Sequence, residues 1–414
     1  MRHPRDISRR QFLNRAGGAA IAVPSLAAVL AACSKPSSPT ASGVGEIPIA
    51  TLDAPVELPM NGEPIAADTP VEAGPLVLYN WADYIYKKTV AEFEEKFNTK
   101  VEITTFNNLE EGIQKVVNGQ VSPDVFFPTP EWIRRLVAQN LLQPLQHELI
   151  PNMEATVWHI YSNPGPYYDL NWRYTVPYTI YTWGVAYRRD LVDDPDLAAQ
   201  GWDALWNRDY AGAISLYDSY GDTIAVTILR TGSTDVNSED PIVIEAAKEA
   251  ILQTINDNQA RLTINGTYAK LPAGDFTVSE AWSGDIIGAK WYLPKDTSKD
   301  VLGYWRPDPG RTMIANDMLV VPTSAKSPRL AHEFLNFMLD KEHGYDNFVN
   351  WNGYQPPFTS IDPSTLIDKG IVTENLASAV VTEEMFKTDL TPYERPPDVD
   401  QIWLDAWAEI KAGA

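Results

Sequence analysis

Cysteine is nearly absent from this chain, because Cys33 is the single cysteine among 414 residues. One cysteine excludes an internal disulfide and a cluster of thiolate metal ligands, and it leaves no thiol nucleophile beyond position 33. The five histidines are scattered, and no two of them stand at the spacing of a metal-ligand pair. We therefore expect neither a disulfide framework nor a metal site.

Catalytic motifs are also missing. The chain has no G-x-S-x-G nucleophile elbow, no G-x-x-x-x-G-K-[ST] phosphate loop, no G-x-G-x-x-G and no H-E-x-x-H. The acid-rich segment 190–197 lacks the glycine and glutamate spacing of a calcium-binding EF-hand loop. These absences favour a binding protein over an enzyme, and they indicate no cofactor.

Basic residues are few, since 33 Lys and Arg stand against 55 Asp and Glu, a formal net charge of −22. Such a chain repels the phosphates of nucleic acid, so no nucleic-acid partner is expected. The same charge attracts cations, although an acidic surface also serves solubility alone. The net charge therefore favours a positively charged ligand, and individual residues must identify the site.

The N-terminal segment carries export signals. The apolar run 17–32 is shorter than the ~18 residues that span a bilayer, so a short transmembrane anchor is the less favoured alternative. SRRQFL at 8–13 resembles a twin-arginine export signal, and LAAC at 30–33 resembles a lipobox. We expect residues 1–32 to be a signal peptide and Cys33 to be lipidated, which places the protein in the periplasm or at the cell surface, anchored to the membrane.

Residues 33–74 are rich in Pro, Ser, Ala and acids, and no helical or strand period persists in them. This composition predicts a flexible tether between the lipid anchor and the folded body. The folded body is then expected to begin near residue 75.

Apolar periodicity alternates regularly after residue 75. Strand-like runs lie at 75–80, 100–108 and 124–128, and helical spacing follows each of them at 86–100, 109–119 and 131–142. Alternating strands and helices predict a parallel α/β sheet. Because ligands of such sheets bind beyond the carboxyl ends of the strands, NWADY and PTPEW stand at favoured positions for a site.

A second region begins near residue 183. It predicts a strand, loop and helix over 211–232, a helix over 241–255, a strand with an acid–aromatic turn over 276–293, and a strand over 316–322. A helix is predicted to follow, with Ser327 as its N-cap, Pro328 as its first residue, and Leu330, Phe334 and Met338 on its apolar face.

Acids beside aromatic residues recur in the predicted loops. The members are Trp81, Asp83 and Tyr84 in NWADY, Asp218 and Asp222 in LYDSYGD, Trp282 and Asp285 in AWSGD, and Asp317 in IANDML, with Tyr354 in NGYQPP as a further aromatic. Carboxylates accept charge-assisted hydrogen bonds from ammonium groups, and aromatic faces attract cations and cover methylenes. Together these loops predict a site for an organic cation.

Each of these residues also has a structural alternative. Trp81 and Trp282 suit core or interface packing, and loop aspartates frequently cap helices. Asp83 fits a cap of the helix that follows it, and Asp222 fits a cap of the helix after LYDSYGD. Asp83 and Asp285 also fit the paired carboxylates of a secreted hydrolase, which is a remote alternative.

The same segments resemble the polyamine-binding branch of the extracytoplasmic solute-binding proteins that serve ABC importers. The resemblance covers about residues 75–414 and is carried by LVLYNWADYI, SPDVFFPTPEWIRRL, VPYTIYTWGVAYRRDLV, WDALWN, AWSGD, NDMLVVPTSAKSPRLAHEFLNFMLD and WNGYQPP. It implies an α/β fold of the type II periplasmic-binding-protein class, with two lobes and a ligand cleft between them. Lobe 1 is expected over 75–182 and 314–358, and lobe 2 over 183–313 and 359–414.

The resemblance also implies roles for the aromatic and hydroxyl residues. Trp81, Tyr84 and Trp282 stand where the family stacks aromatics along the methylene chain. Tyr354 stands where an aromatic closes the far side of the cleft, and Thr129 stands where a hydroxyl faces it.

Roles for the acids follow in the same way. Asp83 resembles the acid between the first two aromatics, and Asp218 or Asp222 stands near the acid that grips one end of the polyamine. Asp285 resembles the acid of the putrescine-preferring branch, and Asp317 matches an acid that binds an amine.

Two positions depart from the family pattern. Ala315 and Glu131 stand where the family commonly has aromatics, so the first widens the expected pocket and the second either adds a carboxylate or faces solvent. The implied function is capture of putrescine or spermidine by a monomer, without a cofactor, for delivery to the permease of an ABC importer. A binding protein for another small solute, such as a different cation or a sugar, and a polyamine sensor without transport remain alternatives.

Overall fold

The computed structural model describes residues 47–158 and 165–414. The expected signal peptide, the lipidation site Cys33 and the first part of the tether lie outside the described residues. Within the described ranges, no helix is long and apolar enough to cross a membrane.

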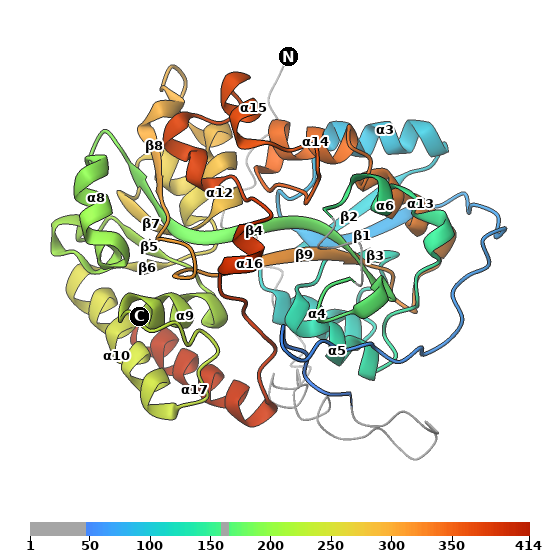
Figure 1. The fold of residues 1–414 in the computed structure, drawn as a ribbon, viewed down its shortest axis with the longest axis horizontal. Coiled ribbons are helices and arrows are strands. Elements are labelled where there is room, and N and C mark those ends of the chain that lie inside the picture. The colour runs from blue at the N-terminus through green and yellow to red at the C-terminus, as the bar shows by residue number, and fades with distance from the viewer. Residues whose placement is uncertain (1–46, 159–164) are drawn as a thin grey trace, which may run out of the picture.

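In the described residues, nine strands form one continuous sheet system (Figure 1). The strands are β1 (Leu76–Trp81), β2 (Val101–Phe106), β3 (Val125–Phe126), β4 (Thr175–Arg188), β5 (Ile214–Leu216), β6 (Arg261–Leu262), β7 (Val278–Trp282), β8 (Leu302–Trp305) and β9 (Ile314–Val320). Their order is β2-β1-β3-β9-β4-β7-β5-β6, and β8 pairs with β4 beside this path.

The predicted parallel pairing is confirmed for the first three strands, because β1 pairs parallel with both β2 and β3. β5 also pairs parallel with β6 and β7. However, β9 runs antiparallel to β3, and β4 runs antiparallel to β9, β7 and β8. The sheet is therefore mixed rather than wholly parallel.

The long strand β4 joins the two halves of the molecule. Its residues Thr175 to Thr182 pair with β9, whereas Trp183 to Tyr187 pair with β7. Figure 1 shows this strand running through both halves, with β1–β3 beside one half and β5–β8 beside the other. We refer to these halves as the first and second lobe. The residue limits given above for lobes 1 and 2 stay a prediction.

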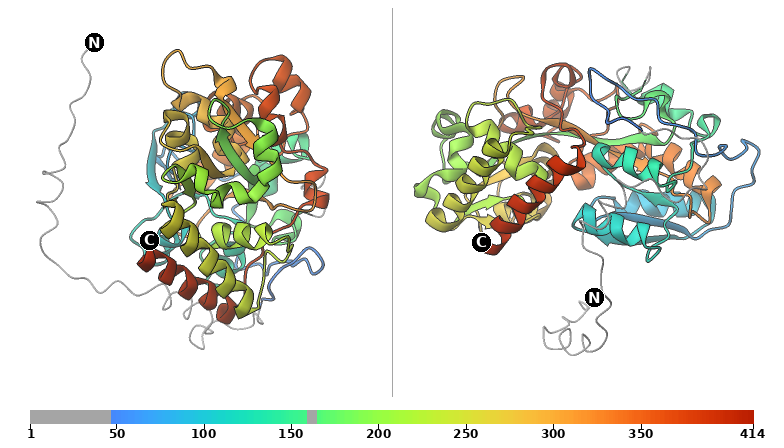
Figure 2. Two further views of the ribbon diagram at one scale, coloured as in Figure 1. Left: turned by 90° about the vertical axis from the view of Figure 1, so that its left-hand side faces the viewer. Right: turned by 90° about the horizontal axis from the view of Figure 1, so that it is seen from below.

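Helices cover the sheet in each lobe (Figure 2). Those that pack with the first lobe are α3 (Lys87–Phe97), α4 (Leu109–Val117), α5 (Pro130–Ala138), α6 (Asn152–Thr156), α13 (Pro328–Met338) and α14 (His343–Asn347). Those after β4 and at the C-terminus are α8 (Asp194–Gln200), α9 (Tyr220–Arg230), α10 (Pro241–Asn258), α11 (Leu271–Ala273), α12 (Ser283–Gly288), α15 (Pro363–Asp368), α16 (Met385–Thr388) and α17 (Pro397–Gly413). The C-terminal helix α17 packs against α9 and α10 of the second lobe.

The predicted helices form where the apolar spacing placed them. The side chain of Asn108 accepts a hydrogen bond from the backbone of Glu111 and so caps α4. Ser327 is the N-cap residue of α13 and Pro328 its first residue, as predicted, but the serine side chain makes no capping bond. Instead the carboxylate of Glu72 accepts from the backbone nitrogens of Arg329 and Leu330.

This contact of Glu72 belongs to a segment, 47–74, that was expected to be part of a flexible tether. The segment contains no helix or strand. Leu58 is nevertheless fully buried, and the backbone of Val56 exchanges hydrogen bonds with Tyr167 and Leu170. This part of the expected tether is thus packed on the first lobe, because its apolar residues are buried in one cluster with apolar residues of that lobe.

Candidate ligand-binding site

A cavity of about 440 Å³ lies where residues from both lobes converge. Its wall includes all ten residues that the sequence singled out for ligand binding, namely Trp81, Asp83, Tyr84, Thr129, Asp218, Asp222, Trp282, Asp285, Asp317 and Tyr354. Most of them stand at strand ends or in the first turns of helices, as ligand residues of α/β sheets commonly do.

Asp317 on β9 is a buried carboxylate held by two tyrosines. The hydroxyl of Tyr84 donates to Asp317 Oδ2 at 2.6 Å, and the hydroxyl of Tyr181 donates to Oδ1 at 3.0 Å. Only 5% of the residue is exposed, and burial raises the pKa of Asp317 to about 7. No basic side chain of the described residues pairs with it.

Asp285 in the first turn of α12 repeats this arrangement in the second lobe. The hydroxyl of Tyr354 donates to its Oδ1 at 2.7 Å, and the hydroxyl of Tyr217 donates to its Oδ2 at 2.8 Å. Burial raises the pKa of Asp285 to about 7 as well. Tyr217 also stacks on Trp282 with ring centres 3.9 Å apart, which fixes the indole in the cavity wall.

Tyr354 connects the two carboxylates. Its ring meets Tyr84 edge-on at 5.0 Å and Tyr181 edge-on at 5.7 Å, while its hydroxyl bonds Asp285. Only a glycine at position 284 permits this approach, because a Cβ there would lie 2.3 Å from the Tyr354 ring. The first turn of α12 and the Tyr354 loop therefore pack directly against each other.

Asp83 lies in the turn between β1 and α3 with φ of 57°. The interpretation of Asp83 as a helix cap is wrong, because α3 begins at Lys87 with Tyr86 as its N-cap and no side-chain capping bond. The side chain of Asp83 is exposed, and burial together with the Asp83 charge raises the pKa of Tyr292 to about 12. Asp83 thus adds negative charge at the end of the cavity that Tyr292 lines.

Trp81 at the end of β1 both packs and lines the cavity. Its ring lies 4.7 Å from Phe106, which accounts for the packing alternative. Trp81 nevertheless lines the cavity, and its buried indole Nε1 has no hydrogen-bond partner in the described structure.

The two candidate acids before α9 differ in their partners. Asp218 pairs with Lys411 of α17 at 2.5 Å, so its charge is already balanced. Asp222 lies in the first turn of α9, after the N-cap Ser219, and accepts from that serine and from Trp183 Nε1 at 3.0 Å. It is therefore part of the helix start, yet it lines the cavity and burial raises its pKa.

Glu131 enters the cavity wall rather than facing solvent only. The hydroxyl of Thr129 donates to Glu131 Oε1 at 2.6 Å, and burial raises the pKa of Glu131. Glu110 at the start of α4 lines the cavity too, and burial, with the nearby charges of Glu131 and Asp222, raises its pKa to about 7. The cavity thus carries more carboxylates than the sequence predicted.

Several cavity residues were missed from the sequence. Tyr181, Trp183 and Tyr217 stand in or beside buried strands, where an aromatic gives no signal of facing a cavity. Tyr217 does precede Asp218 directly, which was its one available signal. Glu110 fits a solvent-facing helix start in NNLEEG equally well, so its position required the tertiary structure.

Metal ligation finds no support in the described ranges, where no group of three His, Cys, Asp or Glu side chains is placed to hold an ion. The cavity instead combines separate carboxylates with tyrosine and tryptophan faces. This combination suits an extended organic cation better than a metal ion.

Comparison with known proteins agrees with this architecture. The family model described as bacterial extracellular solute-binding protein matches residues 88–373. The putative spermidine/putrescine ABC transporter protein from Listeria monocytogenes superposes with a TM-score of 0.69 at 22% identity, over 81% of this chain and 98% of its own. The predicted α/β fold with two lobes, of periplasmic-binding-protein type, is confirmed.

Two relatives align over most of their length. The putrescine-binding periplasmic protein PotF of Escherichia coli K12 is 24% identical over 357 residues, which cover 82% of this chain and 91% of PotF. The putrescine/agmatine-binding protein of Pseudomonas aeruginosa PAO1 is 25% identical over 353 residues, 81% of this chain and 92% of that protein. These relatives are binding proteins rather than enzymes, and the chain itself belongs to the family of bacterial extracellular solute-binding proteins.

Proposed function

We propose that this protein captures polyamines such as putrescine and spermidine in the cavity between its lobes. The observation that carries the proposal is the pair of buried carboxylates, Asp285 and Asp317, each held by two tyrosine hydroxyls in an aromatic wall. Relatives whose names state putrescine or spermidine binding support the ligand class.

The chemistry of the wall matches both parts of a polyamine. Ammonium groups lose hydration on entering a buried site, and this loss is offset only where carboxylates accept their hydrogen bonds. Asp285 and Asp317 are placed to do so, and Asp222 supplies a third acid. Between the charges, the faces of Trp81, Trp282 and other cavity aromatics cover the methylenes.

Ligand binding also resolves the electrostatic cost of the empty cavity. Burial raises the pKa of Glu110, Asp285 and Asp317 to about 7, so these acids are partly protonated near neutral pH in the unliganded site. A bound dication replaces those protons and restores the charged carboxylates. A neutral sugar offers no such compensation, which argues against the sugar alternative.

The assignments beyond the ligand class are further parts of the proposal. Closure of the lobes around the ligand presents a closed form to the permease subunits of an ABC importer, in the periplasm or outside the cell. Export by the twin-arginine route and lipid anchoring at Cys33 rest on the N-terminal motifs alone. Asp222 is a better candidate than Asp218 for the acid that binds one end of the polyamine, because Lys411 already balances the charge of Asp218.

Titration calorimetry tests the ligand class directly. Putrescine, spermidine and spermine are titrated into the purified protein, with glucose and lysine as comparison solutes. We expect heat and saturation with the polyamines and none with glucose. Absence of binding by all three polyamines at micromolar protein would overturn the proposal, and saturation by lysine or glucose alone would assign a different solute.

Glu131 makes a prediction about ligand length. The Glu131→Gln change removes a carboxylate near Asp222 while leaving an oxygen for the Thr129 hydroxyl. We expect spermidine and spermine, with their additional amines, to lose about 3- to 10-fold in affinity, and putrescine to lose less. Equal losses for all three amines, measured by the same titrations, would show that Glu131 does not contact a third amine.

A further inference from the structure

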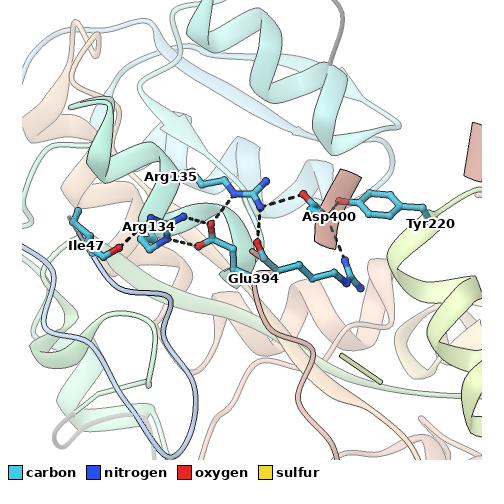
Figure 3. A network of polar contacts seen from close by, with 7 residues as sticks. Ile47, Arg134, Arg135, Tyr220, Glu394 and Asp400 are labelled. Carbon is cyan, nitrogen blue, oxygen red and sulfur yellow. Dashed lines mark hydrogen bonds and ion pairs between the residues drawn. The ribbon is translucent and has the colours of Figure 1, made fainter. Parts of the chain in front are cut away.

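An ion-pair network lies buried between α5 and the segment that leads into α17 (Figure 3). The guanidinium of Arg134 binds Glu394 through Nε at 2.7 Å and through Nη2 at 2.5 Å. Arg135 donates from Nε to the same Glu394 at 2.7 Å, and from Nη2 to Asp400 at 3.1 Å and to the carbonyl of Arg395 at 3.3 Å. One helix of the first lobe is thus tied to the C-terminal segment by several bonds.

Burial makes this network different from the surface ion pairs of the protein. The side chains of Arg135, Glu394 and Asp400 are 6%, 5% and 2% exposed. Asp400 also accepts from the hydroxyl of Tyr220 at 3.0 Å and lies 3.7 Å from Arg395 Nη1. Charges so far from water are stable only while their partners are in place.

One partner of Arg135, Asp400, belongs to the second lobe. Asp400 is part of α17, which packs against α9 and α10, and Tyr220 begins α9. The chain before Glu394 contacts both lobes. Tyr393 N donates to Asn237 Oδ1 at 2.7 Å and Asn237 Nδ2 donates to the carbonyl of Thr391 at 2.8 Å, while the hydroxyl of Tyr167 donates to the carbonyl of Pro392 at 3.3 Å. Arg135 lies on α5, which packs against β9 in the first lobe.

The network lies beside the ligand cavity without forming its ligand contacts. Glu131 lines the cavity one helical turn before Arg135, on the same face of α5. Arg395 and Tyr220 line the cavity from the other lobe, whereas Arg135, Glu394 and Asp400 do not. Lobe movement that opens the cavity at this end would therefore separate Arg135 from Asp400.

We propose that Arg135, Glu394 and Asp400 form a latch that holds the two lobes closed over the cavity. Arg135 is a positioning residue, since it acts on the ligand only through the balance of closed and open forms. In the open form these charged groups are hydrated, and in the closed form they pair with one another. The latch therefore shifts the equilibrium between open and closed forms without touching the ligand. Ligand affinity scales with the closed population, so the latch sets part of the affinity. The effect of the latch on affinity rests on the proposed function, whereas its effect on the distance between the lobes does not.

Fluorescence transfer between the lobes tests the latch in the full chain. Dyes are placed at Ile103→Cys on β2 and Ile242→Cys on α10, both exposed positions, in a Cys33→Ser background. The variants are Arg135→Gln, Asp400→Asn and the double change, and Arg208→Gln is the control because its pair with Asp257 is exposed and lies within the second lobe. Putrescine dissociation rates and thermal unfolding are measured on the same proteins.

We expect Arg135→Gln to lower the unliganded transfer efficiency toward an open arrangement and to speed putrescine release by at least about tenfold. The effect of the double variant on transfer and release should be smaller than the sum of the two single effects, because the double change removes both charges of the Arg135–Asp400 pair. Unchanged transfer and release in both single variants, with Arg208→Gln as the reference, would overturn the latch. A fall in unfolding temperature with unaltered lobe distance would also overturn it, since the pairs would then serve stability alone.

A failure of the proposed function gives a different result. If the wild-type protein binds no polyamine, the release measurement is lost, but the unliganded transfer efficiency still compares wild type with Arg135→Gln. A change there supports the latch whatever the ligand is. Should Arg135→Gln fail to fold, Asp400→Asn removes the same pair from the other lobe and keeps a polar side chain of equal size.

Discussion

Replacing Asp317 by asparagine is expected to weaken putrescine binding by about 100-fold or more, because a buried ammonium then loses its charged acceptor. The amide keeps the shape of the carboxylate and still accepts a hydrogen bond from Tyr84 or Tyr181. Folding should therefore be preserved, and the loss should appear in the dissociation constant measured by titration calorimetry.

A matched control for this change is Asp296→Asn. Asp296 is exposed, lies away from the cavity wall and has φ of 68°, a backbone conformation that asparagine adopts as readily as aspartate. We expect it to bind putrescine like the wild type. If Asp317→Asn retained wild-type affinity, the assignment of Asp317 to an ammonium group would fail, whereas retained binding of a neutral solute would point to a different ligand class.

Putrescine affinity is expected to rise up to about 100-fold between pH 6 and pH 8. Burial places the pKa of both Asp285 and Asp317 at about 7, so each carboxylate is mostly protonated at pH 6 and mostly ionised at pH 8. The amines of putrescine stay charged over this range. Each site that must ionise before binding contributes up to about tenfold, and calorimetry in buffers of differing ionisation heat also counts the protons released.

The stability of the unliganded protein should change in the opposite direction. The folded state holds protons on Asp285 and Asp317 that the unfolded chain releases near the ordinary aspartate value of 3.8. The unfolding free energy contributed by these groups therefore falls as pH rises from about 4 to 7. Affinity that stayed constant from pH 6 to pH 8 would show that neither carboxylate titrates in the empty cavity.

The first lobe was predictable because its signals are local. The apolar spacing over 86–100, for example, can be recognised within one helix, and α3 forms there. β4 is different, because 13 of its 14 residues are buried and its aromatic and polar residues do not alternate by face. The residues of β7, β8 and β9 that pair with β4 lie more than 90 residues further along the chain. No local sequence pattern therefore predicts one long strand shared by both lobes.

The site was predictable where acid and aromatic are neighbours in sequence, and not where they meet only in space. Trp282 and Asp285 belong to one motif, but Tyr217, which bonds Asp285, comes from the end of another strand. Arg395 reaches the cavity only because the C-terminal segment returns across both lobes. Such residues become visible through the packing of distant elements, which composition and spacing do not encode locally.

The packed segment 47–74 shortens the tether that the sequence suggests. If the whole of 33–74 were free, its extended length from Cys33 would be about 150 Å, whereas the 14 Cα–Cα steps from Cys33 to Ile47 span about 50 Å at most. The carbonyl of Ile47 accepts from Arg134 of α5, so Ile47 lies beside the latch. If Cys33 is anchored as proposed, Ile47 would then lie within about 50 Å of the membrane surface. That short reach raises its effective concentration near a permease in the same membrane.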